Sequence, residues 1–259
     1  MNTAQQTDAS STRALIATAC RILGKLDLSH EALGHVSHRA PGSDTLLIKA
    51  KGPAEAGLRY CTPDDVIEVD FDVHAVRPPA GLRPPSETFI HTWIYRENPD
   101  VRSVVHVHPE HAVLLTICGL PVRPIYGAYG TGSRLAVDPV PVYPHSMTIA
   151  DDEIGRDFAR FMGTGPVAMM RGHGVTVTGS SVEEATIRTI AFCRLATMTY
   201  RAHLLGTPRV LPDGEIDELR RPISEHRPRG SAGGPAGVLA TWRYYERLAG
   251  GAEPDGTHR

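Results

Sequence analysis

The sequence predicts an α/β fold with mixed or antiparallel strands. Short apolar runs rich in β-branched residues predict strands, and longer segments with apolar residues every three or four positions predict helices. The two kinds of segment do not alternate strictly, as they would in a parallel sheet. The chain has 259 residues, of which 41% are hydrophobic, enough for a substantial core in one such domain or in two small ones. Because no repeat or clear boundary divides it, we expect a single domain over residues 1–259.

The first part of the chain combines a helix with two strands. Residues 12–26 place apolar side chains on one helical face. Residues 34–44, GHVSHRAPGSD, have the composition of a turn-rich connection. The runs at 45–50 and 66–72 are typical of strands.

The middle of the chain predicts a helix, a strand and a second helix. Ser86 is expected to cap the first helix, which ends near Asn98. Residues 101–108 then form a strand. Pro109 suits the first turn of the next helix, which stops at Gly119.

The second half of the chain predicts two short strands around 140–142 and 167–170, with a helix over 152–162 between them. A capping box of Ser181 with Glu184 opens a long helix that runs toward Gly206.

The C-terminal region is expected to hold an extended loop followed by a helix. Residues 207–236 are rich in Pro, Arg and Gly, and either this loop or a disordered linker would have that composition. An amphipathic helix follows at about 237–249 and carries Trp242, Tyr244 and Tyr245.

Charge and cysteine content exclude several classes of protein. The formal net charge is −2, without the basic excess of nucleic-acid or membrane-surface binders, so we expect a small-molecule substrate. The four cysteines are scattered singly, which fits neither a zinc ribbon nor a disulfide framework. With no secretory signal and no apolar run of the ~20 residues that span a membrane, we expect a cytoplasmic location.

A histidine-rich strand is the first candidate functional site. In SVVHVHPEHAV (103–113), residues two apart share a face of the strand, so His106 and His108 project side by side. Two imidazoles so placed can bind one divalent metal ion, although a hydrogen-bonded pair is the alternative. His111, one turn into the next helix, is expected at the surface.

Two further residues extend this candidate site. His173 lies between two glycines in RGHG (171–174), where the backbone can bend and turn a side chain toward a cavity. A third histidine would complete a three-ligand site that leaves a coordination position free for substrate. Glu87, at the start of the helix before the histidine strand, is either an electrostatic cap or an acid–base residue.

These motifs together resemble the class II aldolase/adducin family, of the L-fuculose-phosphate aldolase type. The resemblance rests on PSETFIHTWIYRENPDVRSVVHVHP and MMRGHGVTVTGSSVEEA and extends over about residues 12–206. It implies a three-layer αβα sandwich around a largely antiparallel sheet, and a homotetramer with active sites at subunit interfaces. It also implies one divalent ion per chain, Zn²⁺ or Mn²⁺ first and Co²⁺ or Fe²⁺ as alternatives, held by His106, His108 and His173. Glu87 would be the catalytic acid–base residue.

Three departures from the sugar-phosphate aldolase pattern bear on the substrate. His35 in GHVS stands where those enzymes have an asparagine, and Lys49 and Lys51 in IKAKG replace a hydroxyl-containing turn. Pro85 replaces one serine of their Ser-Ser-Glu run and leaves Ser86. Cations thus replace a neutral phosphate cradle, which argues against a phosphosugar.

The same replacements are similar to those in family members that decarboxylate hydroxylated aromatic or pyridine dicarboxylates, such as 3,4-dihydroxyphthalate decarboxylase. This resemblance implies a metal-dependent lyase whose substrate carboxylate contacts His35, Lys49, Lys51 or Ser86, with Arg39 as a further candidate. The lysines could instead lie on a solvated strand edge. Three other functions stay open: an aldolase for an unphosphorylated hydroxy-keto acid, a three-histidine iron oxygenase for an aromatic substrate, and a non-catalytic binding protein.

Overall fold

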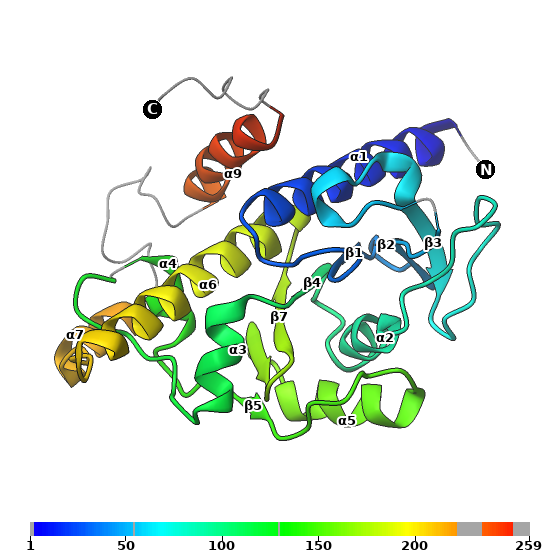
Figure 1. Cartoon of the computed structure of the whole chain (residues 1–259). Helices are drawn as coiled ribbons and strands as arrows, with labels where there is room; N and C mark the ends of the chain where they lie inside the picture. The colour runs from blue at the N-terminus through cyan, green and yellow to red at the C-terminus, as the bar shows by residue number, and fades with distance from the viewer. Residues whose placement is uncertain (1–2, 54, 129, 222–234, 251–259) are drawn as a thin grey trace, which may run out of the picture.

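A single seven-stranded sheet forms the centre of the computed structural model, which describes residues 3–53, 55–128, 130–221 and 235–250 (Figure 1). Its strand order is β3-β2-β1-β4-β7-β6-β5, and every neighbouring pair is antiparallel except β5 and β6. The strands are β1 (His35–His38), β2 (Thr45–Lys49), β3 (Val66–Asp70), β4 (Ser103–Val107), β5 (Val142–Tyr143), β6 (Val167–Met170) and β7 (Gly174–Gly179). The largely antiparallel α/β sheet confirms the predicted fold class.

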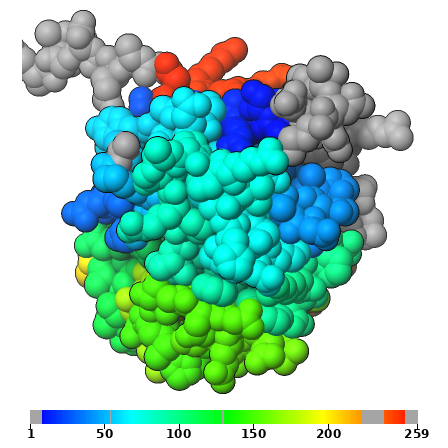
Figure 2. All heavy atoms as spheres, turned by 90° about the vertical axis from the view of Figure 1, so that its right-hand side faces the viewer, coloured from blue at the N-terminus to red at the C-terminus, as the bar shows by residue number. Residues whose placement is uncertain are grey.

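Helices cover both faces of this sheet and give three layers (Figure 1). The helices are α1 (Thr3–Lys25), α2 (Thr88–Glu97), α3 (Glu110–Ile117), α4 (Thr131–Leu135), α5 (Asp152–Met162), α6 (Val182–Leu205), α7 (Asp213–Arg220) and α9 (Pro235–Gly250), with short 3₁₀ turns at Leu58–Tyr60 and Pro63–Asp65. Helices α1, α3 and α6 pack on one face, and α2 and α5 pack on the other. Figure 2 views the molecule from a side where the yellow-green segment that contains α5 forms the lower surface.

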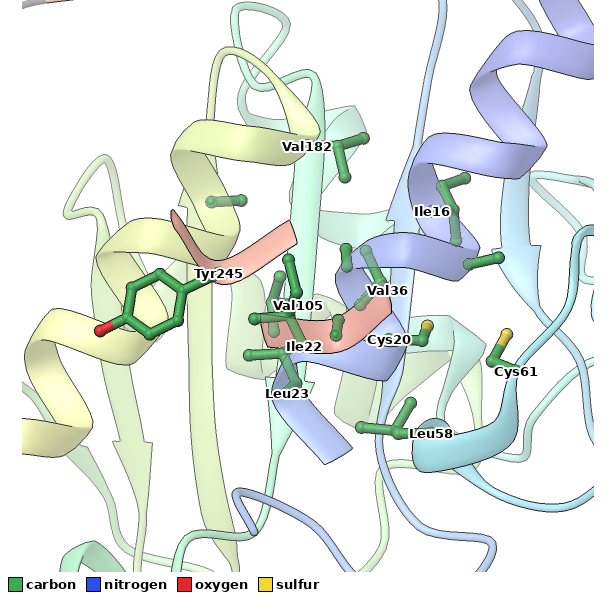
Figure 3. Packing of buried hydrophobic residues seen from close by; sticks show 14 of the residues in the cluster. Ile16, Cys20, Ile22, Leu23, Val36, Leu58, Cys61, Val105, Val182 and Tyr245 are labelled. Carbon is green, nitrogen blue, oxygen red and sulfur yellow. The ribbon is translucent and has the colours of Figure 1, made fainter. Parts of the chain in front are cut away.

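The core beneath α1 shows how one strand serves both layers. Figure 3 shows Ile16, Ile22 and Leu23 of α1 packed near Val105 of β4. Val104, the neighbour of Val105, belongs instead to the cluster under α2 and α5. This alternation is the one expected for a strand buried on both faces, and it sends His106 toward the α2 side with Val104.

Two strands of the sheet were not predicted from the sequence. β1 lies within residues 34–44, which we expected to be a turn-rich connection, yet it pairs with both β2 and β4. Its polar residues, among them His35 and Ser37, carry the signal of a turn, although they are buried. β7 runs through GVTVTG, where Val175 and Val177 alternate with threonines.

Other expectations hold with corrected boundaries. The predicted helices at 12–26, 152–162 and 181–206 correspond to α1, α5 and α6, although α1 begins earlier. The helix that we expected Ser86 to cap is α2. It begins at Thr88 with Glu87 as its N-cap residue, so Ser86 does not cap it. Strand β3 stops at Asp70 because the Asp70 carboxylate accepts hydrogen bonds from two backbone amides of the following turn.

The C-terminal region differs from the expected extended loop. Helix α7 lies inside residues 207–236, and the segment 222–234 lies outside the described residues. The expected C-terminal helix corresponds to α9, whose Trp242 and Tyr245 are buried against the α1 core, while Tyr244 is 66% exposed. Among the described residues, no helix is both long enough and apolar enough to cross a membrane.

Candidate metal centre

Four side chains that are far apart in the sequence converge at one end of the central strands. They are Glu87, His106, His108 and His173, and their ligand atoms all lie within 4.8 Å of one another. Glu87 precedes α2, His106 lies in β4, His108 follows that strand, and His173 lies in the turn between β6 and β7. The structure therefore brings together the residues that the resemblance assigned to the metal and to acid–base chemistry.

The side chains point their reactive atoms at one another. The Nε2 atoms of His106 and His108 are 2.9 Å apart. The Glu87 carboxylate faces the same space, with Oε1 3.2 Å from His173 Nε2 and Oε2 3.6 Å from His106 Nε2. The backbone amide of Ile149 donates to Glu87 Oε1 at 3.2 Å and fixes the carboxylate from behind.

Supporting contacts orient two of the imidazoles. Thr176 on β7 bonds His106 Nδ1 through its hydroxyl at 2.9 Å, so the Nε2 atom of His106 is left for the cluster. Such an outer partner commonly fixes the orientation of a metal-binding histidine. Ser29 accepts a hydrogen bond from the His108 backbone amide at 2.9 Å and anchors the end of the strand.

Gly174 is the residue that allows the two strands to approach at this point. A Cβ atom there would lie 2.6 Å from the Val107 carbonyl oxygen and 2.8 Å from His108 Cδ2. Both separations are shorter than side chains tolerate, so only glycine fits beside the histidines. The RGHG motif thus supplies a histidine and the space that the other two histidines occupy.

The protonation states suit a cation. Burial lowers the pKa of His106 and lowers that of His108 to about 4, so both imidazoles are neutral, as metal ligation requires. Burial alone would raise the pKa of Glu87, but His106, His173 and His35 outweigh it and hold that pKa below its ordinary value. Burial lowers the pKa of His173 too, but the contact with Glu87 outweighs it and raises that pKa, so His173 has to give up a proton when it binds a metal.

This donor set fits a divalent ion. Imidazole nitrogens and a carboxylate oxygen are the usual protein ligands of zinc and suit several other first-row metals. The Nδ1 atom of His108 is buried and has no hydrogen-bond partner among the described residues. The polar contact of this ring is made through Nε2, which faces the cluster. The four residues form a candidate metal centre, and the geometry does not choose among Zn²⁺, Mn²⁺, Co²⁺ and Fe²⁺.

His35 is the one predicted substrate-binding residue that reaches this centre directly. Its ring stacks on His106 with the centroids 5.2 Å apart, and its Nε2 lies 3.8 Å from Glu87 Oε2. On its other side, His35 Nδ1 lies 2.7 Å from Nε2 of His91, which also contacts Ser37.

His91 and Tyr95 were missed in the sequence analysis. Glu87, His91 and Tyr95 are spaced four residues apart, and this spacing places them on one face of a helix. That row of polar groups in an otherwise apolar face is the signal that could have found them.

Lys49 does not face the centre, contrary to our expectation. It pairs in register with Val66 of β3, whose side chain belongs to the α1 core, whereas His35 points to the α2 side. The Lys49 ammonium is 1% exposed and forms an ion pair with Glu55 at 2.6 Å. The buried pair is a structural element of the α1 face.

The other predicted substrate contacts differ among themselves. Lys51 is half-buried beyond the end of β2, and its charge contributes to lowering the pKa of His35 and His108 after the larger effect of burial. Ser86 is exposed. Arg39 is buried and donates to the carbonyl oxygens of Tyr95 and Pro99, so it joins α2 to the sheet.

His111 is half-buried, in contrast to the expected surface position. It stacks on Tyr200 with the ring centroids 4.6 Å apart and contacts the Thr197 hydroxyl at 3.1 Å. This histidine joins α3 to α6 and lies outside the cluster.

Two cavities of the described chain lie away from this cluster. Cavities of about 540 and 710 Å³ are lined mainly by α6 and α9, and none of the four cluster residues lines either of them. The candidate centre is therefore identified by its converging donor atoms.

Comparisons with known proteins show the family and the fold of the chain. Residues 14–200 match the Class II Aldolase and Adducin N-terminal domain. The chain is 39% identical over 197 residues to a 3,4-dihydroxyphthalate decarboxylase from Terrabacter sp., covering 75% of this chain and 82% of that protein. It is 36% identical over 212 residues to the Arthrobacter keyseri protein of the same name, covering 80% and 85%. The solved structure of L-fuculose 1-phosphate aldolase from Glaciozyma antarctica superimposes with a TM-score of 0.76 at 15% identity, over 96% of this chain and 92% of that one.

Proposed function

Because the chain belongs to the class II aldolase and adducin family and is a lyase of that family, we propose that it decarboxylates a hydroxylated aromatic dicarboxylate. The observation that carries the proposal is the convergence of Glu87 with His106, His108 and His173. This site has the two parts that the reaction needs, a place for a cation and a carboxylate beside it. The names of the relatives at 36% and 39% identity support decarboxylation over aldol cleavage.

The metal supplies stabilisation of negative charge. His106, His108 and His173 would hold the divalent cation, which when bound would supply Lewis-acid stabilisation of negative charge on the substrate, an effect worth several kcal/mol. The neutral state of His106 and His108 suits this task because the imidazoles add no positive charge that would repel the cation.

Glu87 is the residue that moves the proton. Its carboxylate faces the cluster, where it can accept the proton of the substrate's phenolic hydroxyl group. It then delivers this proton to the ring carbon that carries the carboxylate. The carbon–carbon bond breaks, its electron pair restores the aromatic ring, CO₂ leaves, and the phenolate product takes a proton from solvent.

Lys51 is the best candidate for binding a second substrate carboxylate. It is half-buried, it has no ion-pair partner among the described residues, and its charge adds to the effect of burial in lowering the pKa of His108. Lys49 cannot serve in the same way because Glu55 already neutralises it on the other face of the sheet.

A homotetramer with shared active sites is part of the same proposal. Ile117 and Met147 are 61% and 52% exposed, and Ile117 lies beside the Gly172 turn that precedes His173. A second copy of the chain would cover such apolar side chains and exclude water from the reacting atoms. Light scattering at micromolar concentration tests the assembly, and a monomer that is fully active would contradict it.

A substrate and metal panel tests the reaction. The chain, stripped of metal and reloaded with Mn²⁺, Zn²⁺, Co²⁺ or Fe²⁺, is incubated with 3,4-dihydroxyphthalate, with 2,3-dihydroxybenzoate and with unphosphorylated hydroxy-keto acids. We expect stoichiometric CO₂ from the dicarboxylate. Carbonyl products without CO₂ would instead indicate an aldolase, and O₂ consumption that depends on Fe²⁺ would indicate an oxygenase.

Replacement of Glu87 separates its chemical role from a structural one. Glu87→Gln is nearly isosteric and keeps the oxygen that accepts from Ile149, so we expect a folded protein that retains metal. Loss of general acid–base catalysis lowers turnover by ~10²–10⁴-fold. Turnover at the wild-type rate in this variant would reduce Glu87 to a helix cap.

A further inference from the structure

A row of buried polar side chains leads away from the metal centre into the core. His35 Nδ1 lies 2.7 Å from His91 Nε2, His91 Nδ1 lies 2.6 Å from Ser37 Oγ, and Ser37 Oγ lies 2.7 Å from the Tyr95 hydroxyl. All four side chains are buried. Two of them come from β1 at positions two apart, and two come from α2 at positions four apart. Each pair therefore lies on one face of its element, and the two faces meet along this row.

The row has no exit to solvent. At its far end the Tyr95 hydroxyl is 3.3 Å from the Arg102 carbonyl oxygen, and the Arg39 guanidinium lies over the Tyr95 ring at 5.1 Å. Tyr95 is fully buried. The row therefore does not conduct protons from solvent to the centre, and its effect on the centre must be one of orientation.

Hydrogen-bond logic allows this row two directions. Two imidazole nitrogens 2.7 Å apart need one donor and one acceptor, so the tautomers of His35 and His91 depend on each other. In one direction Tyr95 donates to Ser37, Ser37 to His91 Nδ1, and His91 Nε2–H to His35 Nδ1. His35 then carries its proton on Nε2, the atom 3.8 Å from Glu87 Oε2.

The opposite direction is disfavoured at both ends. It would leave the bare Nε2 of His35 facing the Glu87 carboxylate, which is also an acceptor. It would also leave one of two costs: either Ser37 accepts from both His91 and Tyr95 and its own proton has no acceptor among the described contacts, or Tyr95 donates to the Arg102 carbonyl at 3.3 Å, which is longer than its 2.7 Å contact with Ser37.

We propose that His91 is a positioning residue which, with Ser37 and Tyr95 behind it, holds His35 in the Nε2–H tautomer, so that the N–H group of His35 points toward Glu87 Oε2, 3.8 Å away. The inference rests on the proposed role of Glu87 as the group that moves the proton. This N–H group attracts one carboxylate oxygen while the other faces His173, and the substrate then meets a carboxylate with a single geometry.

Two variants of His91 form a matched pair. The amide nitrogen of a glutamine reaches about as far as Nε2 of histidine, so His91→Gln retains the donor to His35. The shorter His91→Asn reaches only the Nδ1 position and loses that donor. We expect His91→Asn to lower kcat by ~10–100-fold, as loss of an outer partner does, with little change in KM, and His91→Gln to retain most of kcat.

The tautomer of His35 can be measured by NMR, and this measurement does not depend on enzyme activity. Zinc-loaded protein labelled with ¹⁵N-histidine is studied by NMR, and His35→Gln assigns the His35 signals. We expect the wild type and His91→Gln to carry the His35 proton on Nε2, and His91→Asn to lose this preference. A proton on Nδ1 of His35 in the wild type overturns the proposal, and so does an unchanged tautomer in a folded His91→Asn protein.

The spectrum of the wild type alone shows which ring nitrogen of His35 carries the proton, so it tests the proposal even where a variant fails to fold. It also separates this inference from the proposed reaction, because the tautomer can be present in a protein that releases no CO₂ from any substrate in the panel.

Discussion

At the ends of strands β4 and β2 lie two pairs of ionisable residues, each with one residue in the strand and one just beyond it, and the structure places the two pairs differently. His106 and His108 converge on one candidate metal centre, with their Nε2 atoms 2.9 Å apart. Lys49 turns to the α1 face and pairs with Glu55, whereas Lys51 lies beyond the end of the strand. The period of a strand predicts that two residues share a face, and it does not predict which face or where the strand ends.

The histidine pair should show the largest effect because both side chains point into one candidate metal site. In His108→Ala the site loses one of three imidazoles, so we expect metal affinity to fall by more than ~100-fold, beyond the 10–100-fold that follows loss of an outer partner. Metal content after gel filtration measures this. Thr176→Val, which removes only the hydroxyl that bonds His106, is the graded control at ~10–100-fold. Full metal occupancy in His108→Ala would exclude His108 as a ligand.

The lysine of the opposite face should affect stability and leave the metal alone. Lys49→Met leaves the buried Glu55 carboxylate without its ion-pair partner. Removing one partner of a buried ion pair lowers the free energy of unfolding by about 3–5 kcal/mol. Denaturant unfolding measures the loss, with metal content unchanged. The double variant Lys49→Met, Glu55→Gln should recover part of the stability. Normal stability together with lost activity in Lys49→Met would return this lysine to the substrate site.

The buried His91 on the α2 side should make the free energy of unfolding depend on pH. Burial holds the pKa of His91 well below its ordinary value, so the folded protein keeps this ring neutral while the unfolded chain takes up a proton near pH 6.5. The contribution to stability is present above pH 6.5 and is lost as pH falls toward the folded pKa, by up to ~1.4 kcal/mol per pH unit. Denaturant unfolding of the metal-free protein between pH 7.5 and 5 should therefore show a shallower decline in His91→Gln. Equal slopes would mean that His91 is protonated in the folded protein.

Lys51 should show the smallest effect and the most selective one. A charge-assisted hydrogen bond contributes roughly 1.5–3 kcal/mol, so Lys51→Met should lower kcat/KM for 3,4-dihydroxyphthalate about tenfold or more. The effect should be weaker on 2,3-dihydroxybenzoate, which lacks the second carboxylate. An equal loss on both substrates would place Lys51 outside the carboxylate contact.

The convergence of the three histidines on a candidate metal centre could be predicted because its signals are local. His106 and His108 are two residues apart in a segment with the pattern of a strand, which predicts that their side chains share a face. His173 lies between two glycines, which predicts a bend that can turn its side chain toward a cavity. Gly174 adds a reason that only the structure gives, since a Cβ atom there would collide with His108.

The missed parts depend on contacts between distant segments. β1 could not be distinguished from a turn because His35 and Ser37 are polar, and they are tolerated in a central strand only because His91 of α2 bonds both of them. Lys49 was misplaced because its partner Glu55 follows the end of β2, and nothing in IKAKG shows which face the lysine takes.

We propose that one ion held by His106, His108 and His173, with Glu87 beside it, supports carbon–carbon bond cleavage, and a metal titration tests this most directly. Metal-free protein receives increasing Mn²⁺ or Zn²⁺ with 3,4-dihydroxyphthalate present, and the rate of CO₂ release is recorded. We expect a rate near zero without metal, a linear rise, and a plateau at one ion per chain. Undiminished CO₂ release from the metal-free protein, or a plateau that survives in His108→Ala, would contradict the account.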